Sequence, residues 1–178
     1  DKRMIYEEAI RMPFVIRYPK EIKAGTRLKD MILNIDFPAL FADYSEIPQP
    51  GFMQGKSFRE NLKGNTPENW RSSMYYRYWL HRTERPAHFG IRTQDYKLAF
   101  FYGQPLDAKG AMKEATEPAW EFYDLQKDPN ELHNAYSDPE YTEIIEELKS
   151  ELQQLRKKYK DTDEQYPVMQ EIFEANWD

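Results

Sequence analysis

The stretch FGIRTQDYKLAFFY, residues 89–102, decides the fold class of this chain. Two runs rich in aromatic and apolar residues flank the pair Gln94-Asp95, which is typical of a short hairpin connection. Runs of the same kind lie on either side of this stretch. The four runs are 74–79, 89–93, 96–102 and 120–125. Four such runs separated by turn residues predict a four-stranded antiparallel sheet, with a longer loop at 103–118.

A long amphipathic helix is predicted after the strands. Asp138 is a good helix cap and Pro139 suits the first helical position, and apolar residues then recur every three or four positions. These apolar residues are Tyr141, Ile144, Ile145, Leu148, Leu152, Leu155 and Tyr159. A helix over about 139–160, laid on one face of the sheet, would give a compact α+β unit over about 71–160. Residues 161–178 are predicted to be a tail that packs back onto the protein.

The first 70 residues have a different character. The short apolar run at 13–18, FVIRY after Pro13, predicts a buried strand, and such a strand needs neighbours on both sides. Asp36 is a suitable cap for a short helix over about 37–45. Because no earlier residues could supply the neighbouring strands, we expect the natural polypeptide to extend upstream. In that case residues 1–70 would close a larger α/β domain, and 71–160 would be a C-terminal subdomain.

The composition excludes several classes of protein. Hydrophobic residues make up 40% of the 178, which is enough for a buried core. The net charge of -6 comes from well-mixed acidic and basic residues, which argues against nucleic acid as a partner and against a basic membrane-binding patch. There is no cysteine, so disulfides and cysteine nucleophiles are excluded within this segment. No apolar run approaches the roughly 20 residues of a membrane-spanning helix.

Residues suited to catalysis are scarce. The sequence has no glycine-rich phosphate loop, no nucleophile elbow around a serine, and no acidic residues at metal-ligand spacing from its three histidines. The segment 77–92, RYWLHRTERPAHFGIR, nevertheless combines four arginines with two histidines. One interpretation is structural: ion pairs at a sheet edge and a histidine satisfied in the core. The other is an anion-binding rim in which His81, Arg85 and His88 contact a sugar or its anionic group.

Several motifs, in order, resemble those of the type I sulfatases, the formylglycine-dependent branch of the alkaline-phosphatase-like superfamily. The similarity extends from Lys2 to about Tyr159 and departs from the family at Ala39, where a threonine is usual. The matching segments are K-x-x-x-Y-E-x-x-x-R-x-P at 2–13, NIDFP at 34–38, MQGKSF at 53–58, HFGIRTQDYKL at 88–98, WEFYDLQKDPNE at 120–131, and N-x-Y at 134–136.

The resemblance implies that this chain is the C-terminal part of a sulfatase that hydrolyses sulfate esters of sulfated carbohydrates or glycosaminoglycans. It implies calcium and a formylglycine nucleophile in the full-length enzyme, supplied by upstream residues, so that the chain alone binds no cofactor and is inactive. Lys2 corresponds to the family lysine that contacts the sulfate group. A periplasmic, secreted or lysosomal location is also implied.

Two alternatives remain open at this point. The parent protein could be a phosphatase or phosphonate hydrolase of the same superfamily, and the upstream sequence would decide between these chemistries. The chain could instead be a non-catalytic carbohydrate-binding module, an interpretation favoured by its 15% aromatic content and by the lack of catalytic machinery.

Overall fold

The computed structural model describes residues 3–177, which divide into two compact units. One unit combines the first 12 residues with residues 73–178, and the other comprises residues 13–72. The boundary near residue 70, between a larger domain and a C-terminal subdomain, stays a prediction for the full-length protein. Residues 3–12, however, group with the sheet rather than with the segment that follows them. Each unit is described separately below.

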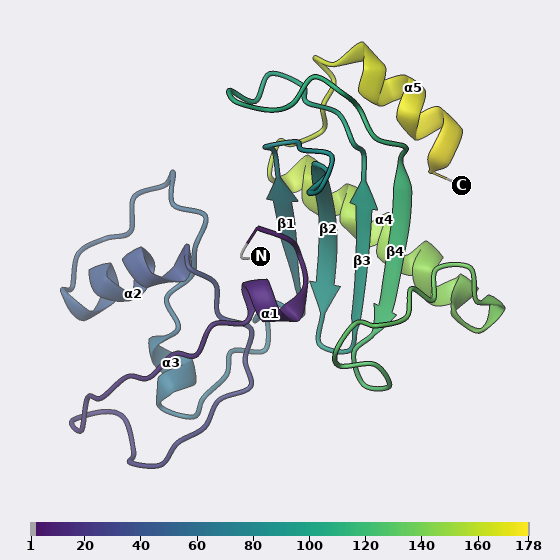
Figure 1. The fold of residues 1–178 in the computed structure, drawn as a ribbon. Coiled ribbons are helices and arrows are strands. Elements are labelled where there is room, and N and C mark those ends of the chain that lie inside the picture. The colour runs from purple at the N-terminus through teal and green to yellow at the C-terminus, as the bar shows by residue number, and fades with distance from the viewer. Residues whose placement is uncertain (1–2, 178) are drawn as a thin grey trace. The chain divides into compact units, whose positions relative to one another are not determined.

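The first unit contains a four-stranded antiparallel sheet with the strands in sequence order (Figure 1). Its strands are β1 (Ser73–Tyr78), β2 (His88–Thr93), β3 (Tyr96–Phe101) and β4 (Ala119–Asp124). Gln94 and Asp95 connect β2 to β3, as the sequence predicts, and residues 103–118 form the long loop before β4. The predicted sheet is therefore confirmed strand by strand. Asn134 covers the outer edge of β4, where its side chain accepts from the Phe122 amide and donates to the Trp120 carbonyl.

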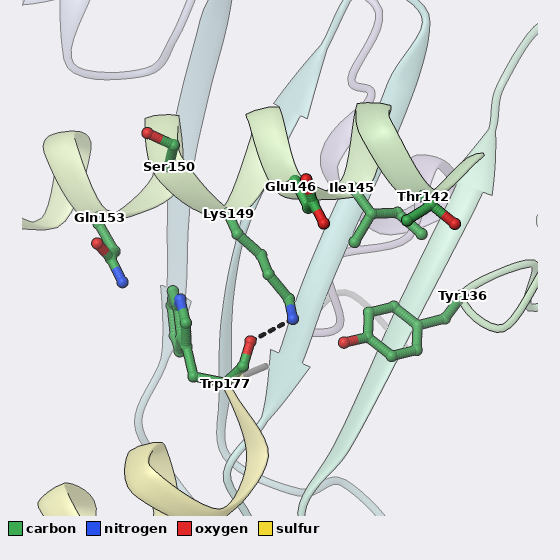
Figure 2. A pocket seen from close by; sticks show the side chains of 8 residues that line it. All are labelled: Tyr136, Thr142, Ile145, Glu146, Lys149, Ser150, Gln153 and Trp177. Carbon is green, nitrogen blue, oxygen red and sulfur yellow. Dashed lines mark hydrogen bonds between the residues drawn. The ribbon is translucent and has the colours of Figure 1, made fainter. Parts of the chain in front are cut away.

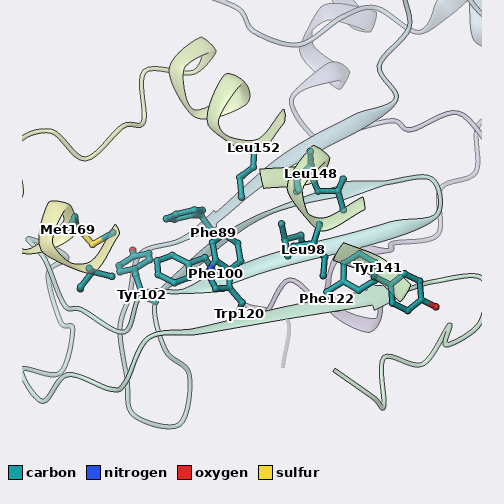
Figure 3. Packing of buried hydrophobic residues seen from close by; sticks show 14 residues of the cluster. Phe89, Leu98, Phe100, Tyr102, Trp120, Phe122, Tyr141, Leu148, Leu152 and Met169 are labelled. Atoms are coloured by element: carbon teal, nitrogen blue, oxygen red, sulfur yellow. The ribbon is translucent and has the colours of Figure 1, made fainter. Parts of the chain in front are cut away.

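One face of the sheet carries the main core. The helix α4 (Thr142–Lys158), preceded by the short 3₁₀ helix η1 (Pro139–Tyr141), crosses this face and turns its apolar side toward it (Figures 1 and 3). Figure 3 shows Leu148 and Leu152 of the helix above the aromatic side chains of the strands. Together η1 and α4 confirm the helix predicted over 139–160. Asp138 caps η1, as predicted, because its side chain accepts a hydrogen bond from the Glu140 amide.

The tail docks on the same core. Residues Pro167–Asn176 form the helix α5, which buries Met169 completely. Trp177 packs against the rings of Phe89, Phe100 and Trp120, with ring centroids 5.1 Å apart in the last pair. The sequence alone does not indicate where the tail docks, and the structure places it beside the strands.

Charged residues fasten the start of this tail. Asp163 is fully buried and accepts hydrogen bonds from Arg77 of β1 and Arg156 of α4. Asp161 accepts from Arg77 and from the hydroxyl of Tyr75. Two carboxylates thus balance two guanidinium groups, as buried ions require. The remaining helix of this unit, α1 (Glu7–Ile10), belongs to the N-terminal segment.

The second unit is built on a smaller apolar cluster. The helices α2 (Asp36–Tyr44) and α3 (Arg59–Leu62) contribute Leu40 and Leu62, which pack with the fully buried Phe58. The helix predicted over 37–45 is therefore present, but Asp36 does not cap it. Its buried carboxylate lies inside the first turn, where it accepts hydrogen bonds from the amides of Leu33 and Lys56 and pairs with Arg71.

The strand predicted over 13–18 is absent. These residues have no regular structure, and Val15 is 92% exposed. Phe14 makes edge contacts with the rings of Phe37 and Phe58, and Tyr18 makes one with the ring of Tyr44. The predicted strand needs neighbouring strands from further upstream, because an apolar run forms a strand only when a neighbouring strand accepts its backbone hydrogen bonds, and it stays a prediction for the full-length protein. Residues 3–177 provide no such neighbour beside 13–18.

Candidate functional site

The sheet face opposite α4 holds the sequence-predicted residue His88 and is organised in three cross-strand rows. Antiparallel pairing places the members of each row side by side on this face. From one end of the strands to the other, the rows are Tyr78–His88–Phe101–Ala119, Tyr76–Gly90–Ala99–Glu121 and Met74–Arg92–Lys97–Tyr123. The middle row places two small residues, Gly90 and Ala99, side by side on neighbouring strands and therefore forms a trough.

The N-terminal segment, residues 3–10, lies in this trough. Ile5 is fully buried and packs with Ala99 and Phe101. A Cβ atom at Gly90 would come within 2.6 Å of the Ile5 side chain, so only glycine leaves room for the segment. The hydroxyl of Tyr76 donates to the carbonyl of Arg3 at 2.8 Å. Glu7 therefore lies at the row that contains Lys97, and Arg3 lies at the row that contains Tyr76. From Glu7 to Arg3 the segment runs across the strands toward the row that contains His88.

Four charges hold the segment at its Glu7 end. We call Glu7, Arg92, Lys97 and Glu131 the four-charge cluster. Arg92 donates to both carboxylate oxygens of Glu7, at 3.1 and 3.0 Å, and the Lys97 ammonium lies 3.0 Å from Glu7 and 2.5 Å from Glu131. Glu131 also accepts from the backbone amide of Glu7 at 2.6 Å. Lys97 is completely buried, so its charge depends on these carboxylates.

The pKa of Glu7 reflects this arrangement. Burial alone would raise it, but the hydrogen bond from Arg92 and the positive charge of Lys97 outweigh burial and lower the pKa below its ordinary value. Glu7 is therefore ionised at neutral pH. Two carboxylates and two cations leave the cluster with no net charge, so it offers no spare cation to an anionic ligand.

A tyrosine pair completes the attachment of the segment. The hydroxyl groups of Tyr6 and Tyr123 both donate to the carboxylate of Glu121, at 2.8 and 3.0 Å. Burial, together with the negative charge of Glu121, raises the pKa of both tyrosines. They remain neutral donors across the range in which enzymes work.

His88 is buried in an aromatic cluster on this face of the sheet. Its ring is buried among Tyr76, Tyr78 and Phe101, with 4.7 Å between its centroid and that of Phe101. Nδ1 lies 2.8 Å from the Pro86 carbonyl and must donate to it, which leaves Nε2 as an acceptor. Within residues 3–177, neither Nε2 nor the neighbouring Tyr78 hydroxyl has a hydrogen-bond partner. Burial lowers the pKa of His88 to about 4, so the ring is neutral.

His81 is engaged elsewhere. Its Nδ1 accepts from the Ala87 amide at 3.2 Å, and its Nε2 donates to the Glu114 carbonyl at 2.8 Å. The buried ring thereby ties the long loop 103–118 to the turn before β2. This matches the structural interpretation of 77–92, in which one histidine is satisfied in the core.

Arg85 lies in the same turn. The backbones of Arg82 and Arg85 form a mutual bridge, and the Arg85 guanidinium lies 3.3 Å from Glu84. Arg77 and Arg92 pair with carboxylates, as the structural interpretation expects, but their partners come from the tail and the N-terminal segment rather than from adjacent strands. The remaining predicted residue, Lys2, lies outside the described residues.

A shallow groove of about 540 Å³ lies on the other side of the unit, between α4 and the end of α5 (Figure 2). Figure 2 shows Lys149 extending from α4 between Tyr136 and Trp177, where its ammonium donates to the Trp177 carbonyl. The same ammonium lies 5.0 and 5.4 Å above the rings of Trp120 and Tyr136. The groove therefore presents aromatic surface next to a cation.

The described part of the chain contains no candidate metal-ligand group and no candidate membrane-spanning helix. Among residues 3–177, no group of three or more His, Cys, Asp or Glu side chains could hold a metal ion. No helix in the same range has the length and apolarity needed to cross a bilayer.

The sequence motifs identify most of the cluster residues but not their convergence. Three of the quoted motifs contain these charges: Glu7 lies in 2–13, Arg92 and Lys97 in 88–98, and Glu121 and Glu131 in 120–131. One feature of the sequence could have indicated a shared site. The motifs place charged residues on strands whose alternate residues are apolar. Such charges must find partners on their own side of the sheet.

The fold and this site define a C-terminal subdomain of the alkaline-phosphatase-like sulfatases. The family model of the N-sulphoglucosamine sulphohydrolase C-terminal region matches residues 1–158. The chain belongs to this family.

Its relatives among known proteins are sulfatases. The chain is 40% identical, over 92% of its length, to an N-acetylglucosamine-6-O-sulfatase of Bacteroides thetaiotaomicron, of which it covers 28%. It is 29% identical, over 83% of its length, to an ulvan-active sulfatase of Formosa agariphila, of which it covers 33%. The chain thus spans about a third or less of the relatives it matches.

Solved structures agree with this assignment. The chain superposes with a TM-score of 0.80 and 39% identity on a protein in complex with its substrate D-glucosamine-2-N,6-O-disulfate, over 94% of this chain and 32% of the other. A phosphonate monoester hydrolase from Silicibacter pomeroyi superposes with a TM-score of 0.68 and 21% identity, over 92% of this chain and 32% of that one. The second similarity shows the shared fold alone.

Proposed function

We propose that the full-length protein containing this chain is a sulfatase that removes a 6-O-sulfate group from glucosamine units of sulfated glycans. The observation that carries the proposal is the family match over residues 1–158, joined to 40% identity with an N-acetylglucosamine-6-O-sulfatase. A similar protein that binds D-glucosamine-2-N,6-O-disulfate supports the same substrate class. The chain alone is not expected to catalyse the reaction, because it spans so little of its relatives.

Lys2 is proposed to contact the sulfate group. A compact ammonium beside sulfate stabilises the negative charge that develops during hydrolysis. Loss of one such donor costs about 3 kcal/mol in the reaction barrier, or roughly a hundredfold in rate.

His88 is proposed to contact the sugar. Its neutral Nε2 is an acceptor without a partner among residues 3–177, and a sugar hydroxyl is a matching donor. Because His88 is fully buried in this chain, the contact requires the aromatic side chains around the ring to move aside. His81 and Arg85 remain part of the same hypothesis, in which the turn they occupy shapes the substrate side. Both ring nitrogens of His81 are already used, so its contribution would come through the position of the loop.

The expected cofactors are calcium and formylglycine, which would supply the Lewis acid and the nucleophile. The described residues do not fit a metal ion, because no suitable ligand group is present among them. We propose that other parts of the full-length protein hold these groups.

The proposal is tested by assaying the full-length protein on three compounds: N-acetylglucosamine 6-sulfate, a phosphonate monoester and a phosphate monoester. We expect sulfate release with a kcat/KM far above that for the other two. Preference for the phosphonate or phosphate ester would place the protein with the other hydrolases that share its fold.

The contribution of the predicted substrate residues is tested by alanine substitution of His81, Arg85 and His88 in turn. His88→Ala should lower kcat/KM for the sulfated sugar about tenfold, which corresponds to the loss of one buried hydrogen bond. Unchanged kcat/KM in all three variants would show that these residues do not contact the substrate.

A second candidate function, glycan binding without catalysis, is favoured by the groove beside Lys149. Aromatic faces stack on sugar rings, and the ammonium suits an anionic substituent. Calorimetric titration of the full-length protein with a sulfated glycan tests this. Binding that disappears in Lys149→Ala while no sulfate is released would favour the binding function over the enzyme.

A further inference from the structure

The four-charge cluster joins parts of the chain that are far apart in sequence. The amide of Glu7 and its acceptor Glu131 are 124 residues apart, Glu7 and Arg92 are 85 apart, and Lys97 and Glu131 are 34 apart. The partners come from the N-terminal segment, two neighbouring strands and the loop after β4. Their only common feature is that all of them meet at the start of α1.

The cluster is closed to ligands. Its charges cancel, Lys97 is completely buried, and the side chain of Glu131 is only 3% exposed. An anionic substrate would have to displace a carboxylate from a buried cation, which is strongly unfavourable. The cluster is therefore part of the architecture and does not bind substrate directly.

The four-charge cluster supplies directional hydrogen bonds, which the apolar contacts of the segment lack. Burial of Ile5 over Gly90 holds the segment against the sheet, but apolar contact has no preferred direction along the trough. Charged hydrogen bonds are directional, and the paired bonds from Arg92 fix both oxygens of Glu7. Glu131 holds the Glu7 amide as well and adopts a left-handed backbone with φ of 56° to do so. The charges thus set the register of residues 3–10 on the strands.

We propose that Glu131, Lys97 and Arg92 are positioning residues that act through segment 3–10 on Lys2, five residues before Glu7. The inference rests on the proposed role of Lys2 as a sulfate contact. A shift of the segment along its trough would move the point at which Lys2 joins it. Misplacement by about 1 Å costs on the order of 100-fold in rate for a reacting group.

The test is a double-mutant cycle in the full-length enzyme, with sulfate release from N-acetylglucosamine 6-sulfate as the readout. Glu131→Gln removes the charge opposite Lys97 and keeps an acceptor for the Glu7 amide. We expect this substitution to lower kcat/KM by about 10- to 100-fold and Lys2→Ala to lower it about 100-fold. In the Lys2→Ala background, Glu131→Gln should lower kcat/KM by less than about twofold, because its effect passes through Lys2.

Two variants guard against a general loss of stability. Arg92→Gln changes the member of the cluster whose side chain is most exposed, so this variant should fold even if Glu131→Gln does not. Its effect on kcat/KM should depend on Lys2 in the same way. Asp161→Asn removes the carboxylate that pairs with Arg77 on the other face of the sheet and should lower the melting temperature. It should leave kcat/KM within about twofold of wild type.

Each outcome is informative. If the cluster substitutions lower kcat/KM equally with and without Lys2, the cluster does not act through Lys2 and the proposal is wrong. The same conclusion follows if they have no effect while Lys2→Ala does, and the proposed function then still stands. If Lys2→Ala has no effect, the proposed role of Lys2 fails together with the inference.

Discussion

Gly90 and His88 lie two residues apart on β2 and face the same side of the sheet, and their roles follow from what surrounds each. Gly90 leaves an empty space that Ile5 fills. His88 has a ring enclosed by aromatic side chains and a nitrogen without a partner among residues 3–177. The first residue decides whether the N-terminal segment can lie on the sheet. The second carries a polar atom, Nε2, that has no hydrogen-bond partner among residues 3–177 when the segment lies on the sheet.

Gly90→Ala should destabilise the protein by about 1–3 kcal/mol, the usual cost of inserting a methyl group into a packed site. The added Cβ would lie 2.5 Å from the Leu98 carbonyl oxygen, which belongs to the backbone and cannot move aside. Urea unfolding of the full-length protein measures this change. Gly51→Ala is the matched control, because a Cβ there meets nothing within 4 Å. Equal stability of the two variants would mean that the trough is not filled by Ile5.

His88 should make the stability of the protein depend on pH between its ordinary pKa and its lowered one. The unfolded chain binds a proton near pH 6.5, whereas burial lowers the pKa of the folded ring to about 4. Because the unfolded state then binds more protons, stability falls as the pH is lowered from 6.5 to 4.

His88→Phe keeps a ring in this aromatic site and removes the titration. The variant should therefore lose less unfolding free energy than wild type when the pH changes from 7 to 5, as measured by urea denaturation at both values. Parallel losses in the two proteins would show that His88 is not buried as a neutral ring.

At the scale of elements, the predictions that held are those in which a local pattern decides the structure. Apolar residues at a spacing of three or four over Tyr141–Tyr159 predict α4, and aromatic runs around Gln94-Asp95 predict the β2–β3 hairpin, since each pattern matches its own backbone period. The strand over 13–18 is not formed among residues 3–177, because its pairing depends on a partner elsewhere, and it stays a prediction for the full-length protein. Asp36 has the residue type of a cap, but Arg71 and two backbone amides determine its actual position.

The docking of α5 depends on the buried carboxylate of Asp163. Asp163→Asn should cost about 3–5 kcal/mol, because it leaves Arg77 and Arg156 buried without that counter-charge. Asparagine tolerates the left-handed backbone at this position, where φ is 62°, so the change isolates the charge. Thermal unfolding of the full-length protein measures the loss. Glu171→Gln on the exposed side of α5 is the control and should leave the melting temperature unchanged.

At the scale of the whole molecule, the sequence predicts the sheet, the covering helix and the family through the order of its motifs. It does not predict that Glu7, Lys97 and Glu131 meet, because their distances in sequence carry no information about a shared site. The candidate site was anticipated only in part. The substrate role of His88 stays a prediction, His81 is used to hold a loop, and Arg77 and Arg92 pair with carboxylates outside the sheet.

The central claim is that this face of the sheet, with segment 3–10 held on it, forms one wall of a sulfate ester site. A crystal structure of the full-length protein with a 6-sulfated glucosamine bound tests this claim most directly. We predict that the Lys2 ammonium lies about 3 Å from a sulfate oxygen and that His88 Nε2 accepts a hydrogen bond from the sugar. A substrate bound away from both residues, with the four-charge cluster intact, would contradict the account.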